Sequence, residues 1–180
     1  MKATNQRDVI VVGGGAAGLN AALILGRARR RVLIGDDGHP RNDVAEKMHG
    51  FISRDGTSPS KLLVKARKEL KSYPSVELIK DKVEKAQHTK IGFSVTLESG
   101  KRFVGKRLLL ANGVRDKLPD IENLTDFWGR SVFVCPFCDG WEFRDRKIGI
   151  YGKTNDAIEL AQELHGWTKK ITVCSETQAG

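Results

Sequence analysis

Two cysteines separated by two residues carry the clearest chemistry in this chain, in the order Cys135-Pro136-Phe137-Cys138-Asp139. A Cys-x-x-Cys pair can close a reversible disulfide. If a helix begins after the first cysteine, its N-terminus stabilises the thiolate, which is the nucleophilic form. Pro136 suits a first helical turn, and Asp139 could give a proton to the leaving thiolate. We therefore predict that Cys135, Cys138 and Asp139 are catalytic.

Two other interpretations of this pair stay open. A zinc site needs four ligands, and only Cys174 and His165 remain, at no familiar spacing, so we expect no metal. The pair could also be two inert buried thiols, and we expect Cys174 to be a core thiol at the end of a strand.

Three cysteines are too few for a disulfide-stapled secreted scaffold. We therefore expect a cytoplasmic protein.

A glycine pattern near the N-terminus predicts a dinucleotide site. It reads Gly13-Gly14-Gly15-Ala16-Ala17-Gly18 and follows the β-branched run 9–12. In a Gly-x-Gly-x-x-Gly turn the first glycine allows the tight turn, the second admits a pyrophosphate, and the third lets helix and strand pack closely. The helix N-terminus then supplies free N–H groups for the phosphates. Asp36, after the next buried run, could bind ribose hydroxyls, and Asp37 is the alternative.

The elements that must position these motifs alternate between strand and helix. We expect helices at residues 16–29, 60–72 and 155–165, and a long functional loop at 35–57. Residues 93–97 and 102–104 alternate apolar and polar side chains around a turn, as in a small antiparallel meander. We expect the remaining strands at the ranges 8–12, 31–34, 76–79, 108–110, 131–134, 147–151 and 170–174.

Net charge and hydropathy raise two further classes, which we disfavour. The chain has 180 residues and a net charge of +9, but its basic residues are spread out. The group from Lys61 to Lys71 is expected on a solvated helix face, so we predict no nucleic-acid binding. The apolar run 9–26 resembles a signal peptide or membrane span, but glycines split it into a strand and a helix. We therefore expect no membrane span.

A second glycine pattern, at Gly152-Lys153-Thr154-Asn155-Asp156-Ala157, is damaged. Thr154 stands at the second glycine, where a β-branched side chain crowds a pyrophosphate. The segment Cys174-Ser175-Glu176-Thr177 offers no arginine for a 2′-phosphate. NADPH therefore remains an open but disfavoured cofactor.

Taken together, these motifs resemble the thioredoxin reductase family of flavoproteins. The resemblance is closest to the gliotoxin-type dithiol oxidoreductase branch and its bacterial relatives. It covers essentially the whole chain. Besides the first glycine pattern and the cysteine motif, the matching segments are Gly38-His39-Pro40-Arg41-Asn42, His49-Gly50-Phe51, Arg54-Asp55-Gly56, Leu110-Ala111-Asn112-Gly113 and Val114-Arg115-Asp116.

The resemblance implies a fold, a cofactor and roles for several residues. The fold would be α/β: a Rossmann-like, three-layer FAD-binding domain at 1–115 with a small antiparallel meander, then an incomplete NAD(P)-binding-type βαβ domain at 116–180. Cys138 would lie against the flavin, Cys135 would exchange with substrate, and Asp139 would act as acid and base. FAD would be held by Gly13, Gly15, Ala16, Ala17, Gly18, Asp36, Arg41, Asn42, His49, Ala111 and Gly113. A loop histidine with ordinary hydrogen bonds is an equal alternative for His49.

The resemblance also implies an activity and partners. We predict a flavin-dependent thiol/disulfide oxidoreductase that forms a homodimer and acts on a thioredoxin-like protein or a small-molecule disulfide or dithiol. The family's NADPH domain and its return to the FAD domain are incomplete here, which implies either a piece of a longer protein or a shortened product. The alternative function is a non-catalytic flavin-binding or interaction remnant.

Overall fold

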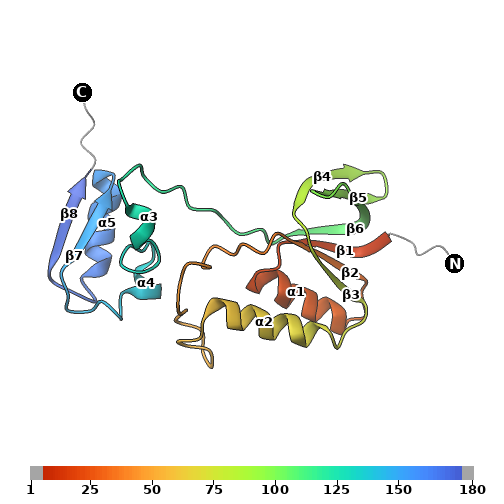
Figure 1. Cartoon of the computed structure of the whole chain (residues 1–180), viewed down its shortest axis with the longest axis horizontal. Coiled ribbons are helices and arrows are strands. Elements are labelled where there is room, and N and C mark those ends of the chain that lie inside the picture. Colours follow the sequence, from red (N-terminus) through yellow and green to blue (C-terminus); the bar gives the residue numbers. More distant parts are fainter. Residues whose placement is uncertain (1–5, 176–180) are drawn as a thin grey trace. The chain divides into compact units, whose positions relative to one another are not determined.

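The computed structural model describes residues 6–175, which form two compact units (Figure 1). Within this range the first unit comprises residues 6–44 and 58–119, and the second comprises residues 45–57 and 120–175. The loop that follows β2 is therefore shared between the units, and its second half belongs with the cysteine motif. Each unit is described by itself below.

The first unit is built on a six-stranded sheet with the order β3-β2-β1-β6-β5-β4. Strands β3, β2, β1 and β6 are parallel, whereas β6, β5 and β4 pair antiparallel as a meander. Its elements are β1 (Gln6–Val12), α1 (Ala16–Arg27), β2 (Val32–Asp36), α2 (Pro59–Leu70), β3 (Val76–Lys80), β4 (Val83–Thr89), β5 (Gly92–Leu97) and β6 (Arg102–Leu110).

Alternation along the buried strands divides the core of this unit into two halves. Val11 and Ile34 face the helices and pack with Leu19 and Leu63. Their neighbours Ile10 and Leu33 face the meander and pack with residues of β5 and β6. Figure 1 shows α1 and α2 on one side of β1–β3, with β4 and β5 on the other. The predicted three-layer α/β fold is confirmed.

Strand β6 joins the two kinds of sheet. We expected separate strands at 102–104 and 108–110, but the structure has one strand that pairs with β5 at its start and with β1 along its length. A Cβ at Gly105 would come within 2.8 Å of the Ile10 side chain, so glycine lets the strand cross over the core. Strand β4 was not predicted, because its side chains are mostly polar and exposed.

Local sequence sets where α1 ends and where α2 begins. Helix α1 ends at Arg27, before the predicted end, and Arg29 takes a left-handed conformation with a φ of 56°. Ser58 caps α2, because its side chain accepts a hydrogen bond from the Lys61 N–H at 3.3 Å. Pro59 then occupies the first turn, where its missing N–H is harmless.

The second unit contains α3 (Leu124–Phe127), α4 (Pro136–Asp139), β7 (Ile148–Gly152), α5 (Thr154–Leu164) and β8 (Ile171–Ser175). Strands β7 and β8 are parallel and α5 connects them. Ile150, Ala157 and Leu164 form the core of this βαβ unit. The strand predicted at 131–134 is wrong. Only one isolated bridge forms there, between Trp128 and Val132, and Phe133 packs against the Phe143 ring instead.

No helix in the described part of the chain combines the length and apolarity that a membrane crossing requires. Among the same residues, no three His, Cys, Asp or Glu side chains gather where they could bind a metal ion.

Candidate active site and cofactor cradle

The first glycine turn connects β1 to α1 and leaves its centre open. Gly13 has a φ of +101°, and a Cβ there would overlap the Ala111 carbonyl oxygen. A Cβ at Gly18 would overlap the Gly13 carbonyl oxygen, so this glycine lets the helix lie against the turn. At Gly15, by contrast, a Cβ would have no heavy atom within 4 Å. The backbone path of the turn thus requires glycine at positions 13 and 18, whereas Gly15 leaves open the space beside the turn.

The start of α1 presents its N–H groups without a side-chain partner. Gly15 is the N-cap residue, no side chain caps the helix, and the first turn contains no acidic residue. Ala16 and Ala17 are exposed and small. A helix start of this kind attracts anions through its free N–H groups and its dipole.

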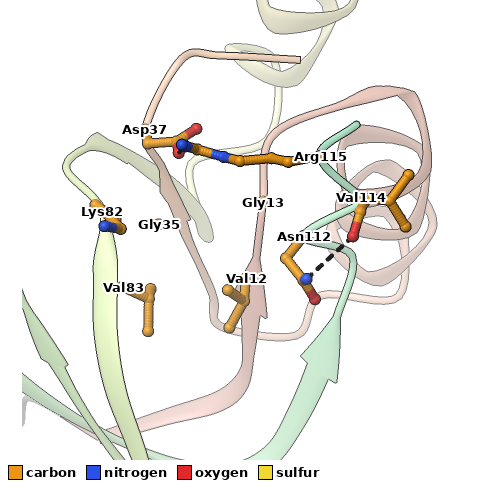
Figure 2. Close-up of a pocket in the computed structure, with 10 residues that line it drawn as sticks. Val12, Gly13, Gly35, Asp37, Lys82, Val83, Asn112, Val114 and Arg115 are labelled. Carbon is orange, nitrogen blue, oxygen red and sulfur yellow. Dashed lines mark hydrogen bonds and ion pairs between the residues drawn. The ribbon is translucent and has the colours of Figure 1, made fainter. Parts of the chain in front are cut away.

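A pocket of about 400 Å³ lies at the carboxyl ends of the parallel strands β1, β2 and β6 (Figure 2). The sheet order reverses at β1, and ligands of α/β sheets bind at such switch points. Asn112 in this wall donates a hydrogen bond from Nδ2 to the Gly113 carbonyl oxygen at 3.2 Å. The pocket is lined by Val12, Gly13, Gly35, Asp37, Lys82, Val83, Asn112, Gly113, Val114 and Arg115.

The two candidate ribose-binding acids lie in different surroundings. Asp36 ends β2 and is buried, and its carboxylate accepts hydrogen bonds from the Gly14 N–H and from the Arg67 guanidinium, both at 2.9 Å. Asp37 lines the pocket and is paired with Arg115 at 2.9 Å. A backbone hydrogen bond from His39 and the Arg115 charge hold the pKa of Asp37 below its usual range.

Two ion pairs tie the segment after β6 to the loop after β2. Figure 2 shows Arg115 reaching toward Asp37. One residue further, Asp116 takes two hydrogen bonds from Arg41, at 2.8 and 2.6 Å, which lower the pKa of Asp116. Arg41 is thus already engaged by a carboxylate, while Asn42 beside it is exposed. Ala111 and Gly113 are close to the turn, because Ala111 lies against Gly13 and Gly113 lines the pocket.

The cysteine pair lies at the start of the short helix α4. Cys135 is its N-cap residue and Pro136 is in its first turn, as the sequence predicted, although the helix has only four residues. The two Sγ atoms are 2.7 Å apart, and no disulfide joins them in the structure. Cys138 is exposed and Cys135 is half-buried. The sulfurs are therefore close enough to form a disulfide with one another, and Cys138 is open to a partner.

Asp139 follows the pair in surroundings that favour its protonated form. Burial raises the pKa of this carboxyl, and the neighbouring Glu142 carboxylate raises it further, while His49 acts in the opposite direction. A carboxyl that keeps its proton more readily is a better general acid.

His49 belongs to the same unit as the cysteine pair, within loop residues 45–57. Its Nδ1 is 3.4 Å from the Asp55 carboxylate and its Nε2 is 3.6 Å from the Glu142 carboxylate. Asp55 also accepts the Gly50 N–H at 2.9 Å, which braces the loop. The structure therefore places His49 between two acids beside Asp139, whereas its predicted contact with a cofactor stays a prediction.

The second glycine turn connects β7 to α5 and is less suited to an anion. Helix α5 begins at Thr154, and Asp156 lies in its first turn, where a carboxylate repels a phosphate. Cys174 lies in β8 and is exposed, so the prediction of a core thiol is wrong. The described chain supplies β7 as the only strand that pairs with β8. Glu176 and Thr177 lie outside the described residues.

Arg67 is the site residue that sequence reasoning missed. We assigned it to a solvated basic face, but its guanidinium pairs with the buried Asp36 and its Nε is buried. The signal was present in the spacing. Leu63, Arg67 and Leu70 recur at the i, i+4, i+7 positions that mark the core-facing stripe of a helix.

FAD fits the residues of the first unit. The cradle consists of the clear space at Gly15, the uncapped start of α1 and the adjoining pocket. A Cβ at Gly15 would partly fill it. NAD(P)H fits the second turn less well, because Thr154 and Asp156 stand where a diphosphate needs glycine and positive potential.

Comparison with known proteins finds relatives that are named thioredoxin reductase or oxidoreductase. Thioredoxin reductase aclD of Aspergillus oryzae is 35% identical over 92% of this chain and 55% of its own length. Thioredoxin reductase sirT of Leptosphaeria maculans is 34% identical over 92% of this chain and 54% of its own. The crystal structure of an oxidoreductase from Agrobacterium tumefaciens is 40% identical, with a TM-score of 0.88 over 93% of this chain and 57% of that one.

The resemblance inferred from the motifs is confirmed by these relatives. The chain spans about half the length of the curated relatives it matches. The family model described as pyridine nucleotide-disulphide oxidoreductase matches residues 7–178. The chain belongs to the pyridine nucleotide-disulphide oxidoreductase family.

Proposed function

We propose that this chain carries the flavin site and the redox-active dithiol of a thiol/disulfide oxidoreductase of the thioredoxin reductase type. The observation that carries the proposal is the Cys135–Cys138 pair, with sulfurs 2.7 Å apart and a neighbouring carboxyl, Asp139, whose pKa is raised. Family membership supports the same reading.

FAD would bind in the first unit. The diphosphate would lie at Gly13, Gly15 and Gly18 and at the start of α1, where Ala16 and Ala17 add no bulk. Asp36 or Asp37 would meet the adenosine ribose, and Ala111, Gly113, Arg41 and Asn42 would border the cofactor. When bound, FAD supplies two-electron exchange with the cysteine pair.

The cysteine residues perform the disulfide chemistry. The Cys135 thiolate attacks one sulfur of the substrate disulfide, which forms a mixed disulfide and releases the other sulfur as a thiolate. Asp139 gives that thiolate a proton. Cys138 then attacks the Cys135 sulfur of the mixed disulfide, and the proton of its thiol passes to the second substrate sulfur. The substrate thus leaves as a dithiol and the pair becomes a disulfide. Two electrons have moved from the cysteine pair to the substrate, and the reverse sequence oxidises a dithiol.

The electron source and the partners belong to the same proposal. NADPH is the reductant that the family implies, although Thr154 and Asp156 weaken its site in the second unit. The substrate would be a thioredoxin-like protein or a small-molecule disulfide or dithiol. We further propose that the protein is cytoplasmic and works as a homodimer.

The test is flavin uptake combined with thiol counting. The purified chain, incubated with FAD and freed of excess cofactor, should show flavin absorbance. Oxidation should then remove two of its free thiols, and replacing both Cys135 and Cys138 with Ser should abolish that loss. A chain without flavin absorbance after reconstitution would contradict the proposal.

A second candidate is a non-catalytic flavin-binding remnant. Thr154 in the second glycine turn and Asp156 in the first turn of α5 favour it, because both weaken a nicotinamide site. NADPH oxidation by the 180-residue chain in the presence of a disulfide acceptor would exclude it.

A further inference from the structure

Asp36 is a buried charge that needs a fixed partner. It is 7% exposed and ends β2 next to the glycine turn. One carboxylate oxygen accepts the Gly14 N–H at 2.9 Å, and the other accepts the Arg67 Nη2 at the same distance. A buried carboxylate that loses such a partner is strongly disfavoured. The position of Asp36 therefore depends on Arg67.

Arg67 reaches this acid from the helical layer, because it lies on α2 whereas Asp36 ends a strand of the sheet. It lies on α2 between Leu63 and Leu70, which are both buried. Its side chain is 36% exposed, yet its Nε is buried and has no hydrogen-bond partner among the described residues. The burial of this nitrogen and the 2.9 Å hydrogen bond from Nη2 to the carboxylate show that the guanidinium is turned toward Asp36 and not toward solvent.

The acid in turn lies directly against the fingerprint turn. A Cβ on Gly14 would come within 2.6 Å of the Asp36 carboxyl carbon, so the backbone of the turn and the carboxylate are in close contact. Gly14 is flanked by Gly13 and Gly15, the residues that shape the cradle. A shift of Asp36 would move the N–H groups that face the cofactor.

We propose that Arg67 is a positioning residue for the dinucleotide cradle. Through a chain of two hydrogen bonds it fixes the Asp36 carboxylate and, through that carboxylate, the backbone of Gly14. This inference rests on the flavin site proposed above. Arg67 does not line the pocket, so it acts on the cofactor through Asp36.

The experiment compares FAD affinity with stability in matched variants. Arg67→Met keeps the unbranched stem of the side chain but removes its charge and donors, and Arg67→Lys restores the charge. Lys68→Met, at an exposed position on the same helix, controls for the loss of one positive charge from α2. FAD dissociation constants come from flavin fluorescence, ADP serves as a competing probe of the adenosine half, and urea unfolding reports stability.

Arg67→Met should weaken FAD and ADP binding by about tenfold, because the unpaired Asp36 carboxylate would no longer hold the backbone of Gly14 in place. Arg67→Lys should recover part of the affinity, and Lys68→Met should bind as the wild type does. Asp36→Asn combined with Arg67→Met should be less impaired than the two single effects added together, because both act through one carboxylate.

Two results separate this inference from the proposed function. Failure of the wild-type chain to bind FAD refutes the flavin site itself. Wild-type affinity in a folded Arg67→Met variant refutes only the role of Arg67. If Arg67→Met does not fold, Arg67→Lys decides the question: a lower FAD affinity at unchanged stability supports the inference, and unchanged affinity overturns it.

Discussion

Replacing Gly15 with Ala should separate cofactor binding from folding. A Cβ at Gly15 meets no protein atom within 4 Å, and the residue has a φ of −75°, which alanine adopts freely. Alanine is a poorer N-cap than glycine, but it lowers the entropy of the unfolded chain. These opposing effects should leave the free energy of unfolding within about 1 kcal/mol of the wild type.

The same methyl group would occupy the space that the cofactor diphosphate needs. Forcing an extra methyl group into a fitted site costs about 1–3 kcal/mol. That loss corresponds to a dissociation constant for FAD raised by about 5- to 150-fold. The variant should therefore be a folded protein with a large and selective loss of flavin affinity.

Gly18→Ala is the matched comparison, three residues along the same turn. Its Cβ would overlap the Gly13 carbonyl oxygen and lie 3.3 Å from the Val11 side chain. The backbone must move to admit it, at a cost of about 1–3 kcal/mol. For a chain of this size that lowers the Tm by roughly 2–12 °C. Gly149→Ala, which also meets open space but lies in β7, should change neither property.

The assay is FAD titration by fluorescence together with thermal unfolding of the cofactor-free chain. If Gly15→Ala binds FAD as tightly as the wild type, the open space at Gly15 is not a cofactor site. If Gly15→Ala lowers the Tm as much as Gly18→Ala does, Gly15 is needed for folding and not only for the cofactor.

Three further predictions concern the dithiol, its acid and the pH dependence of stability. Cys138→Ser should let Cys135 form a mixed disulfide with a substrate but prevent its release, so mass spectrometry should detect a trapped adduct. The control variant Cys174→Ser should not trap an adduct. If Cys135→Ser traps the adduct and Cys138→Ser does not, the assigned roles of the two cysteines are reversed. Asp139→Asn should lower the rate of disulfide reduction by about a hundredfold. In the plot of this rate against pH, Glu142→Gln should shift the falling limb to lower pH, because Glu142 helps to raise the pKa of Asp139. An unchanged limb would exclude Asp139 as the acid. The backbone N–H of Arg31, with the Arg31 and Lys106 side chains, lowers the pKa of Asp8 from 3.8 to about 2, and this stabilisation is present above about pH 4 and lost as the pH falls through about 2. Arg31 is 48% exposed and Lys106 is 56% exposed, so solvent screens their pairs with Asp8. Asp8→Asn should therefore cost only about 1 kcal/mol at pH 7, and urea unfolding should show the difference from the wild type disappearing toward pH 2.

Much of the fold was predictable because its signals are local. Residues 9–12 form a continuous β-branched run before three glycines, and the structure has β1 and α1 in those places. The alternation at Phe93, Val95 and Leu97 likewise predicted part of the meander. The strand expected at 131–134 failed because β-branched residues form a strand only where another strand is available to pair with them.

The site was predictable where a motif fixes the backbone, and less so where side chains from distant segments meet. Gly13, Gly18 and Cys135 take the local positions that their motifs imply. The pairing of Arg67 with Asp36, 31 residues apart, depends on how α2 packs on α1 and the shared core. The bonds from Arg41 to Asp116 span 75 residues, and the sequence contains no local signal for them.

A reductive titration of the FAD-loaded, oxidised chain, followed by flavin absorbance, tests the redox-active dithiol most directly. We expect the wild type to take up two electrons for the flavin and two more for the Cys135–Cys138 disulfide. The variant with both cysteines replaced by Ser should take up only the flavin's two. Equal electron uptake by the wild type and the double variant would contradict a redox-active dithiol in this chain.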